Sequence, residues 1–168
     1  NVADSLSYFQ SDGYMMLCSG GLAGVFRFRW QANYTRITAE GRYLMPREWG
    51  REPFYTFLPR ERNEGAGNVH AATVNLIWRS RAGLRIQADA GRYWLPPIAN
   101  ARLNKYAMPS YYQFGINAQY PFKGDWQGLA VQVLQLVKLA APGEEYTNKQ
   151  AYNKVDLYHG ELIVSYAF

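Results

Sequence analysis

Apolar and polar residues alternate repeatedly along this chain, and this pattern favours an all-β fold. The alternation is strictest over ten consecutive residues, Phe26 to Thr35. Successive side chains of a β-strand point to opposite faces, so a strand here has one apolar and one polar face. The apolar positions are Phe26, Phe28, Trp30, Ala32 and Tyr34, and the polar positions are Arg27, Arg29, Gln31, Asn33 and Thr35. A soluble sheet with one solvent-exposed face also shows this alternation. However, the many aromatic residues on the apolar face and the arginines on the polar face favour lipid on one side and an aqueous pore on the other.

Five further segments alternate in a similar way. They cover residues 69–80, 84–91, 110–122, 128–138 and 153–168, while residues 14–18 are a weaker candidate followed by a turn at 19–21. Segment 128–138 carries leucines on both faces, which indicates either a β-bulge or a partly covered inner face. Six strands and one weaker candidate fall short of the roughly eight that a closed bacterial barrel needs. The sequence therefore predicts the C-terminal portion of a larger barrel.

The connections between these segments differ in length in an ordered way. Long ones cover residues 38–68, 96–109 and 140–152, and short turns lie near 19–22, 81–83 and 122–126. If strand direction alternates, the long connections share one edge of the sheet and the short turns share the other. Short periplasmic turns and long external loops are typical of outer-membrane β-barrels. The longest connection is expected to be a functional loop, which in a porin can fold into the pore and narrow it.

The end of the chain supports the same interpretation. Leu162, Val164, Tyr166 and Phe168 fall on one face of the last predicted strand. The stretch resembles the closing strand of bacterial outer-membrane barrels, which ends in Phe and is recognised by the barrel-assembly machinery. Tyr166 and Phe168 are therefore the predicted assembly signal. An ordinary amphipathic edge strand is the alternative.

Composition and charge exclude several other classes. Aromatic residues make up 16% of the chain although its mean hydropathy is below zero, and no apolar run reaches the length of a transmembrane helix. The net charge of +5 raises nucleic acid as a partner, but the arginines stand at alternate strand positions or in the long connection, which favours a basic lumen. Cys18 is the single cysteine, so neither an internal disulfide nor a Cys-rich metal site is predicted. The first residues lack a secretion signal, which we expect to have been removed or to lie upstream.

Four segments resemble the OprD-type substrate-specific porin family as it occurs in Bacteroidetes-like bacteria. They are residues 41–71, 103–120, 122–134 and 153–168. The resemblance implies a monomeric channel of about eighteen strands, of which this chain is the C-terminal part. It also implies passive diffusion of small anionic or zwitterionic nutrients along a basic ladder towards a constriction formed by inward-folded loops.

Carried onto this sequence, the resemblance selects two groups of charged residues. The pore-lining candidates are Arg27, Arg29, Arg79, Arg85, Asp89 and Glu161. The constriction-loop candidates are Arg47, Glu48, Arg51, Glu52, Arg60, Glu61 and Arg62. Guanidinium groups suit carboxylates because their planar fork binds two oxygens at once. Any single arginine could equally be paired with Asp89 or Glu161 for structural reasons.

Two other classes stay open beside the porin. A lipid-modifying enzyme in a small closed barrel would have to use His70 or His159 with Ser80, Ser165 or Asp156, but no nucleophile motif accompanies either histidine. We expect His159 instead to form a structural hydrogen bond with Glu161, two residues away on the same face. The other class is a structural or adhesion barrel, or a subunit of a larger envelope complex.

The sequence thus predicts one domain over residues 1–168, an antiparallel meander in a transmembrane barrel of a Gram-negative outer membrane. It predicts no catalytic residues, no metal, no cofactor and no nucleic acid partner. The expected partners are outer-membrane lipid and lipopolysaccharide, the barrel-assembly machinery, small polar solutes and other envelope proteins.

Overall fold

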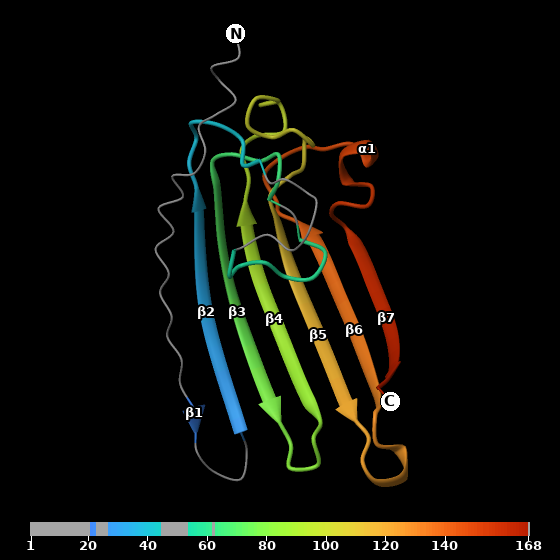
Figure 1. The fold of residues 1–168 in the computed structure, drawn as a ribbon. Helices are drawn as coiled ribbons and strands as arrows, with labels where there is room; N and C mark the ends of the chain where they lie inside the picture. The colour runs from blue at the N-terminus through green and yellow to red at the C-terminus, as the bar shows by residue number, and fades with distance from the viewer. Residues whose placement is uncertain (1–20, 23–26, 45–53, 62, 168) are drawn as a thin grey trace.

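The computed structural model describes residues 21–22, 27–44, 54–61 and 63–167, which form one antiparallel sheet with its strands in chain order (Figure 1). The strands are β1 (Gly21–Leu22), β2 (Arg27–Ile37), β3 (Val69–Arg79), β4 (Arg85–Trp94), β5 (Tyr111–Pro121), β6 (Leu129–Ala140) and β7 (Leu157–Tyr166). A 3-10 turn, η2 (Gly124–Trp126), and a four-residue helix, α1 (Asn148–Ala151), lie in the connections. The predicted all-β meander is confirmed.

Three predicted boundaries are wrong. Tyr93 and Trp94 belong to β4 and pair with neighbouring strands, so this strand extends beyond the predicted segment 84–91. Residues 153–156 precede β7, because Asn153 and Asp156 adopt left-handed backbone conformations that a strand cannot contain. Gly21–Leu22 is a strand paired with β2 where a turn was predicted. The weaker candidate strand at 14–18 lies outside the described residues.

The connections are sorted by length, as predicted. The long connections β2–β3, β4–β5 and β6–β7 meet at one edge of the sheet, and the short turns β3–β4 and β5–β6 lie at the other (Figure 1). The β3–β4 turn closes tightly because Gly83 takes a left-handed φ of 103° and its N–H donates to the Ser80 carbonyl at 3.3 Å.

The two faces of the sheet differ in chemistry and in exposure. We call the face of Trp30, Leu76, Ala88 and Ile116, which form one register row across β2 to β5, the apolar face. Its side chains stand exposed along β3 and β5 to β7: Val74, Leu76, Phe114, Ile116, Val133, Leu162, Val164 and Tyr166. We call the opposite one the polar face. Six of its polar side chains are buried: Asn33, Thr35, Thr73, Asp89, Gln113 and Lys138. A soluble sheet usually buries its apolar face and exposes its polar face, and this sheet does the reverse.

The buried apolar residues gather where the long connections meet the polar face. One cluster joins Ile37 and Val69 to Tyr43 and Ala66 of the β2–β3 connection. A second joins Ala71, Tyr93 and Tyr111 to Val155, with the rings of Tyr93 and Tyr111 stacked at 4.7 Å. The core of the described chain thus sits between the sheet and its long connections.

Strand β6 pairs with both neighbours without interruption, so the β-bulge considered for it is wrong. The alternative, a covered inner face, fits the structure because Leu134 and Leu136 are buried on the polar face. Apolar residues on both sides of β6 therefore reflect burial on one face and exposure on the other.

Candidate functional site

Residues 54–61 of the β2–β3 connection lie against the polar face and contact three different strands. The Thr56 hydroxyl donates to the Thr35 hydroxyl at 2.8 Å, and the Tyr93 hydroxyl donates to the Thr56 carbonyl at 2.6 Å. The Gln113 amide donates to the Pro59 carbonyl at 2.7 Å. We call residues 54–61 the crossing segment, since they connect the side chains of β2, β4 and β5 across the sheet.

The crossing segment ends at a buried group of charged and aromatic side chains. The Tyr111 hydroxyl donates to the Glu61 carboxylate, whose Oε2 lies 3.7 Å from Lys138 Nζ. Lys138 Nζ also lies 3.3 Å from the Arg60 carbonyl and 4.4 Å from the centre of the Tyr111 ring. Glu61, Lys138 and Tyr111 are 6%, 4% and 1% exposed. A buried ammonium requires such partners, because desolvation of an unpaired charge is unfavourable by several kcal/mol.

Gly91 explains why the crossing segment can lie so close to the sheet. A Cβ added at this position would lie 2.9 Å from the Tyr93 ring and 3.1 Å from Leu58 Cδ1. The absent side chain leaves the space that Leu58 and the Tyr93 ring fill.

A hydrogen-bonded network of polar side chains crosses the same face beside this segment. The Asn33 amide donates to Asn75 at 2.9 Å, the Asn75 amide donates to Asp89 at 2.6 Å, and the Gln87 amide donates to Asp89 at 2.9 Å. The Arg85 guanidinium donates to Gln87. Asp89 is therefore held by amides and is connected to Arg85 only through Gln87. Among the described residues no arginine pairs directly with Asp89, so that alternative is wrong for them.

The arginines predicted to line a pore are brought together. Arg27, Arg79 and Arg85 are directly paired across β2, β3 and β4, and Arg29 is two residues further along β2. Arg29 and Arg79 are exposed. The three paired positions form a row at the edge of the short turns, away from the long connections. Three adjacent strands thus place arginine positions side by side on the polar face.

The two histidines occupy different faces. His159 Nε2 lies 2.5 Å from Glu161 Oε1, which confirms the predicted hydrogen bond, and His159 Nδ1 lies 3.5 Å from Arg60 Nη1. Glu161 thus pairs with a histidine rather than with an arginine. His70 Nδ1 lies 2.5 Å from the Tyr34 hydroxyl. Among the described residues, neither histidine is hydrogen-bonded to Ser80, Ser165 or Asp156, so no Ser-His-acid arrangement is formed there.

Several candidates cannot be placed. Arg27 is placed in β2 by its backbone alone, and the following lie outside the described residues: Arg47, Glu48, Arg51, Glu52, Arg62 and Phe168. Tyr166 pairs with Leu129 at the edge of the short turns and is exposed on the apolar face.

Sequence reasoning missed the side chains that hold the crossing segment: Tyr93, Tyr111, Gln113 and Lys138. One signal was available, because Lys138 is the single lysine within the described strands and stands among apolar neighbours. The other three resemble ordinary polar-face residues, and their role depends on where the connection crosses the sheet.

The described residues contain no group of three His, Cys, Asp or Glu side chains placed to hold a metal ion. None of the described helices is long and apolar enough to cross a membrane. The chain was compared with protein-family models, curated proteins and solved structures, and none of these matches it. The resemblance to OprD-type porins therefore stays a prediction from the sequence.

Proposed function

We propose that this chain forms part of a β-barrel in the outer membrane of a Gram-negative bacterium, and that the barrel conducts small polar, anionic or zwitterionic solutes by passive diffusion. In this arrangement the apolar face contacts lipid and the polar face lines an aqueous lumen. The crossing segment narrows that lumen. No catalytic role is proposed.

The observation that carries the proposal is the reversed exposure of the two faces. Ile116 and Leu162 are 56% and 70% exposed on the apolar face, whereas Gln113 and Lys138 of the polar face are buried beneath the crossing segment. Large contiguous apolar surfaces are rare on soluble monomers, and an outward apolar band with a polar interior is the pattern of outer-membrane barrels.

The height of the apolar face supports a bilayer as its surroundings. On β5, Tyr112 and Tyr120 point to this face and bracket Phe114, Ile116 and Ala118. They lie eight residues apart, which is about 27 Å along a strand and about 19–22 Å in height at the 35–45° tilt of barrel strands. The apolar band of an outer-membrane barrel is about 25 Å tall and is bordered by aromatic girdles.

The charges of the polar face support the proposed solute class. On this face Arg79 and Arg85 provide adjacent guanidinium groups, and neither of them is ion-paired with a carboxylate of the described residues. Fixed positive charges lower the barrier to an anion in a narrow aqueous passage. Glu61 lies in the crossing segment, where it is paired with Lys138.

The test is single-channel recording in planar bilayers with protein extracted from outer membranes. Its intact mass, compared with 19.3 kDa, also tells whether the natural chain is longer. We expect anion-selective conductance, and Arg79→Glu should shift the reversal potential towards cation selectivity. The control Arg81→Glu makes the same charge change in the exposed β3–β4 turn and should shift it much less.

Absence of conductance from correctly inserted protein would overturn the proposal. It would favour a small closed barrel with a structural, adhesion or lipid-modifying role. Equal shifts of the reversal potential from Arg79→Glu and Arg81→Glu would show that the anion selectivity does not depend on the arginine row.

A further inference from the structure

Two arginines stand on the apolar face where β2 and β4 run into the long connections. Arg36 lies on this face of β2, two residues after Tyr34, and pairs with His70 of β3. Arg92 lies on the same face of β4 and pairs with Tyr112 of β5. We call Arg36 and Arg92 the basic rim. Among the described residues neither arginine forms an ion pair with a carboxylate. Outer-membrane barrels turn the edge of their long connections to the outside, so the proposed function places the basic rim at the outer leaflet.

Arg92 is fixed in place but incompletely hydrogen-bonded. Its guanidinium carbon lies 4.2 Å from the Tyr112 ring centre and 5.3 Å from the Trp94 ring centre. Its Nη1 is buried and has no hydrogen-bond partner in the described part of the chain. The two rings hold the guanidinium by cation–π contacts but accept no hydrogen bond of ordinary strength. A buried donor of this kind requires an acceptor from outside the chain.

A polar hollow of about 300 Å³ begins at Arg92 and leaves space for that acceptor. Ser110 and Gly143 line it, and so does Glu144, whose Oε1 accepts a hydrogen bond from the Ile98 N–H at 2.6 Å. An anion bound by Arg92 therefore shares the hollow with one carboxylate. Because like charges repel, removal of that carboxylate should strengthen the binding of an anion, which provides a test of the ligand's charge.

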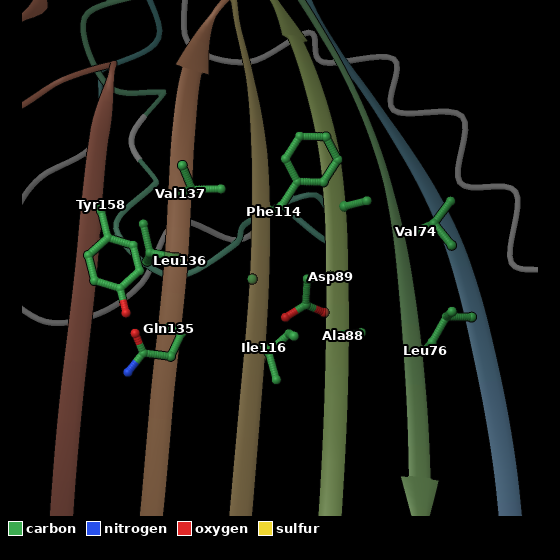
Figure 2. Close-up of a pocket in the computed structure, with 12 residues that line it drawn as sticks. Val74, Leu76, Ala88, Asp89, Phe114, Ile116, Gln135, Leu136, Val137 and Tyr158 are labelled. Atoms are coloured by element: carbon green, nitrogen blue, oxygen red, sulfur yellow. The ribbon is translucent and has the colours of Figure 1, made fainter.

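On the bilayer side of the basic rim the apolar face is broad rather than grooved along one strand. Figure 2 shows its apolar hollow of about 490 Å³, with Val74 of β3 at one end and Tyr158 of β7 at the other. The hollow thus crosses five neighbouring strands, which is about 19 Å at the usual strand spacing. A surface of this width suits a lipid with several acyl chains side by side under one head group.

We infer that the basic rim binds lipopolysaccharide, with a phosphate of its lipid A head group on Arg92. Arg36 provides a second positive charge for the same head group, and the acyl chains cover the apolar face on the bilayer side of it. This inference rests on the proposed function, because it requires the apolar face to lie in an outer membrane with the long connections outside.

The chemistry of the basic rim favours a phosphorylated head group. Guanidinium groups bind phosphate oxygens through charge-assisted hydrogen bonds. Arg92 keeps a donor for this purpose. Arg36 already donates to Asn68 at 2.7 Å and to the Val69 carbonyl at 3.2 Å, so it acts mainly through its charge. The two arginines are two strand spacings apart, about 10 Å across the sheet, so one disaccharide head group can approach both.

Native mass spectrometry of the detergent-solubilised protein tests the inference. The probes are lipid A with its phosphates, dephosphorylated lipid A and phosphatidylglycerol, and we expect phosphorylated lipid A to bind most tightly. Arg92→Gln should weaken its binding at least about tenfold, since a hydrogen bond to a charged group is lost. Arg36→Gln should weaken it less, and Glu144→Gln should strengthen it. The control Arg81→Gln makes the same charge change in the β3–β4 turn at the opposite edge and should change nothing.

Equal affinities for phosphorylated and dephosphorylated lipid A would overturn the inference, and so would an Arg92→Gln variant that binds as tightly as the unchanged protein. Full competition by inorganic phosphate at the same concentration would identify a soluble anion as the ligand instead. Tighter binding of phosphatidylglycerol would identify a general site for anionic phospholipids and would contradict the inference too. Glu144→Gln gives a second test in a connection outside the strands, because unchanged or weaker binding there is a contrary result.

Insertion into phosphatidylcholine vesicles separates the two proposals. Protein that does not insert contradicts the proposed function, whereas protein that inserts and conducts without binding lipid A contradicts only the lipid site. Circular dichroism of each variant confirms that the sheet is retained.

Discussion

The contact between Glu61 and Lys138 offers the sharpest test of how the long connection is held. Glu61→Leu removes the carboxylate that accepts from Tyr111 and lies 3.7 Å from Lys138 Nζ. Both partners are buried, so the change leaves an ammonium and a hydroxyl with fewer partners in a dry site. Removal of one member of a buried ion pair destabilises by roughly 3–5 kcal/mol. We take the lower value, about 3 kcal/mol, because Lys138 keeps its hydrogen bond to the Arg60 carbonyl.

This destabilisation is relieved when the crossing segment opens, because opening returns the Lys138 ammonium to water. Glu61→Leu should therefore lower the free energy of opening by the same amount. Hydrogen-exchange mass spectrometry reads this opening at the N–H groups of Phe57 and Glu61, which donate to Phe54 and Leu58 at 3.0 Å. A change of about 3 kcal/mol should accelerate their exchange roughly 100-fold. Exchange within β5 should change far less.

Two variants decide whether the reasoning is correct. Glu61→Leu combined with Lys138→Met removes both charges and should recover a large part of the protection, because a buried pair can often be replaced by apolar residues. Glu145→Leu removes a carboxylate from an exposed position and should leave the segment unchanged. Acceleration of less than tenfold in Glu61→Leu, or no recovery in the double variant, would refute the reasoning.

Three further predictions concern the sheet. Gly91→Val should lower the unfolding free energy by about 1–3 kcal/mol, because its Cβ would lie 2.9 Å from the Tyr93 ring. In the control Gly115→Ala the nearest contact of the new Cβ is 3.6 Å, and equal melting temperatures of the two variants would contradict the close packing at Gly91. Asn75→Leu breaks two hydrogen bonds of the polar network and should lower the free energy of unfolding in urea by roughly 1–3 kcal/mol. An unchanged urea midpoint would contradict this prediction. Ile116→Arg puts a charge on the apolar face and should reduce folding into vesicles by about 2–4 kcal/mol, whereas a soluble sheet would tolerate it.

The strands and their faces could be predicted because they depend on local pattern. Alternation in Phe26 to Thr35 placed β2 and assigned its side chains to faces without knowledge of any other strand. Connection lengths then ordered the edges of the sheet, since each turn reverses the chain. The hydrogen bond between His159 and Glu161 was predictable for the same reason, because two residues in a strand return a side chain to the same face.

Boundaries were less predictable because packing between distant parts decides them. Tyr93 extends β4 since its ring is buried against Tyr111 and its hydroxyl reaches Thr56. The start of β7 is delayed because Asp156 turns into a left-handed conformation, where its carboxylate accepts from the Ala140 N–H at 2.8 Å. The same carboxylate raises the pKa of Tyr146 through a hydrogen bond in the β6–β7 connection. Neither contact follows from the residues next to the boundary.

By itself the sequence determined an antiparallel meander with one apolar and one polar face, because a period of two acts within each strand. Only the tertiary structure decided where the long connection crosses the polar face, and that Lys138 meets Glu61 there, 77 residues away in the chain. Strand register determines which distant side chains come together, and it is set by the whole sheet rather than by one segment. The same register aligned Arg27, Arg79 and Arg85 in one row and placed Arg92 above the small residues of β4.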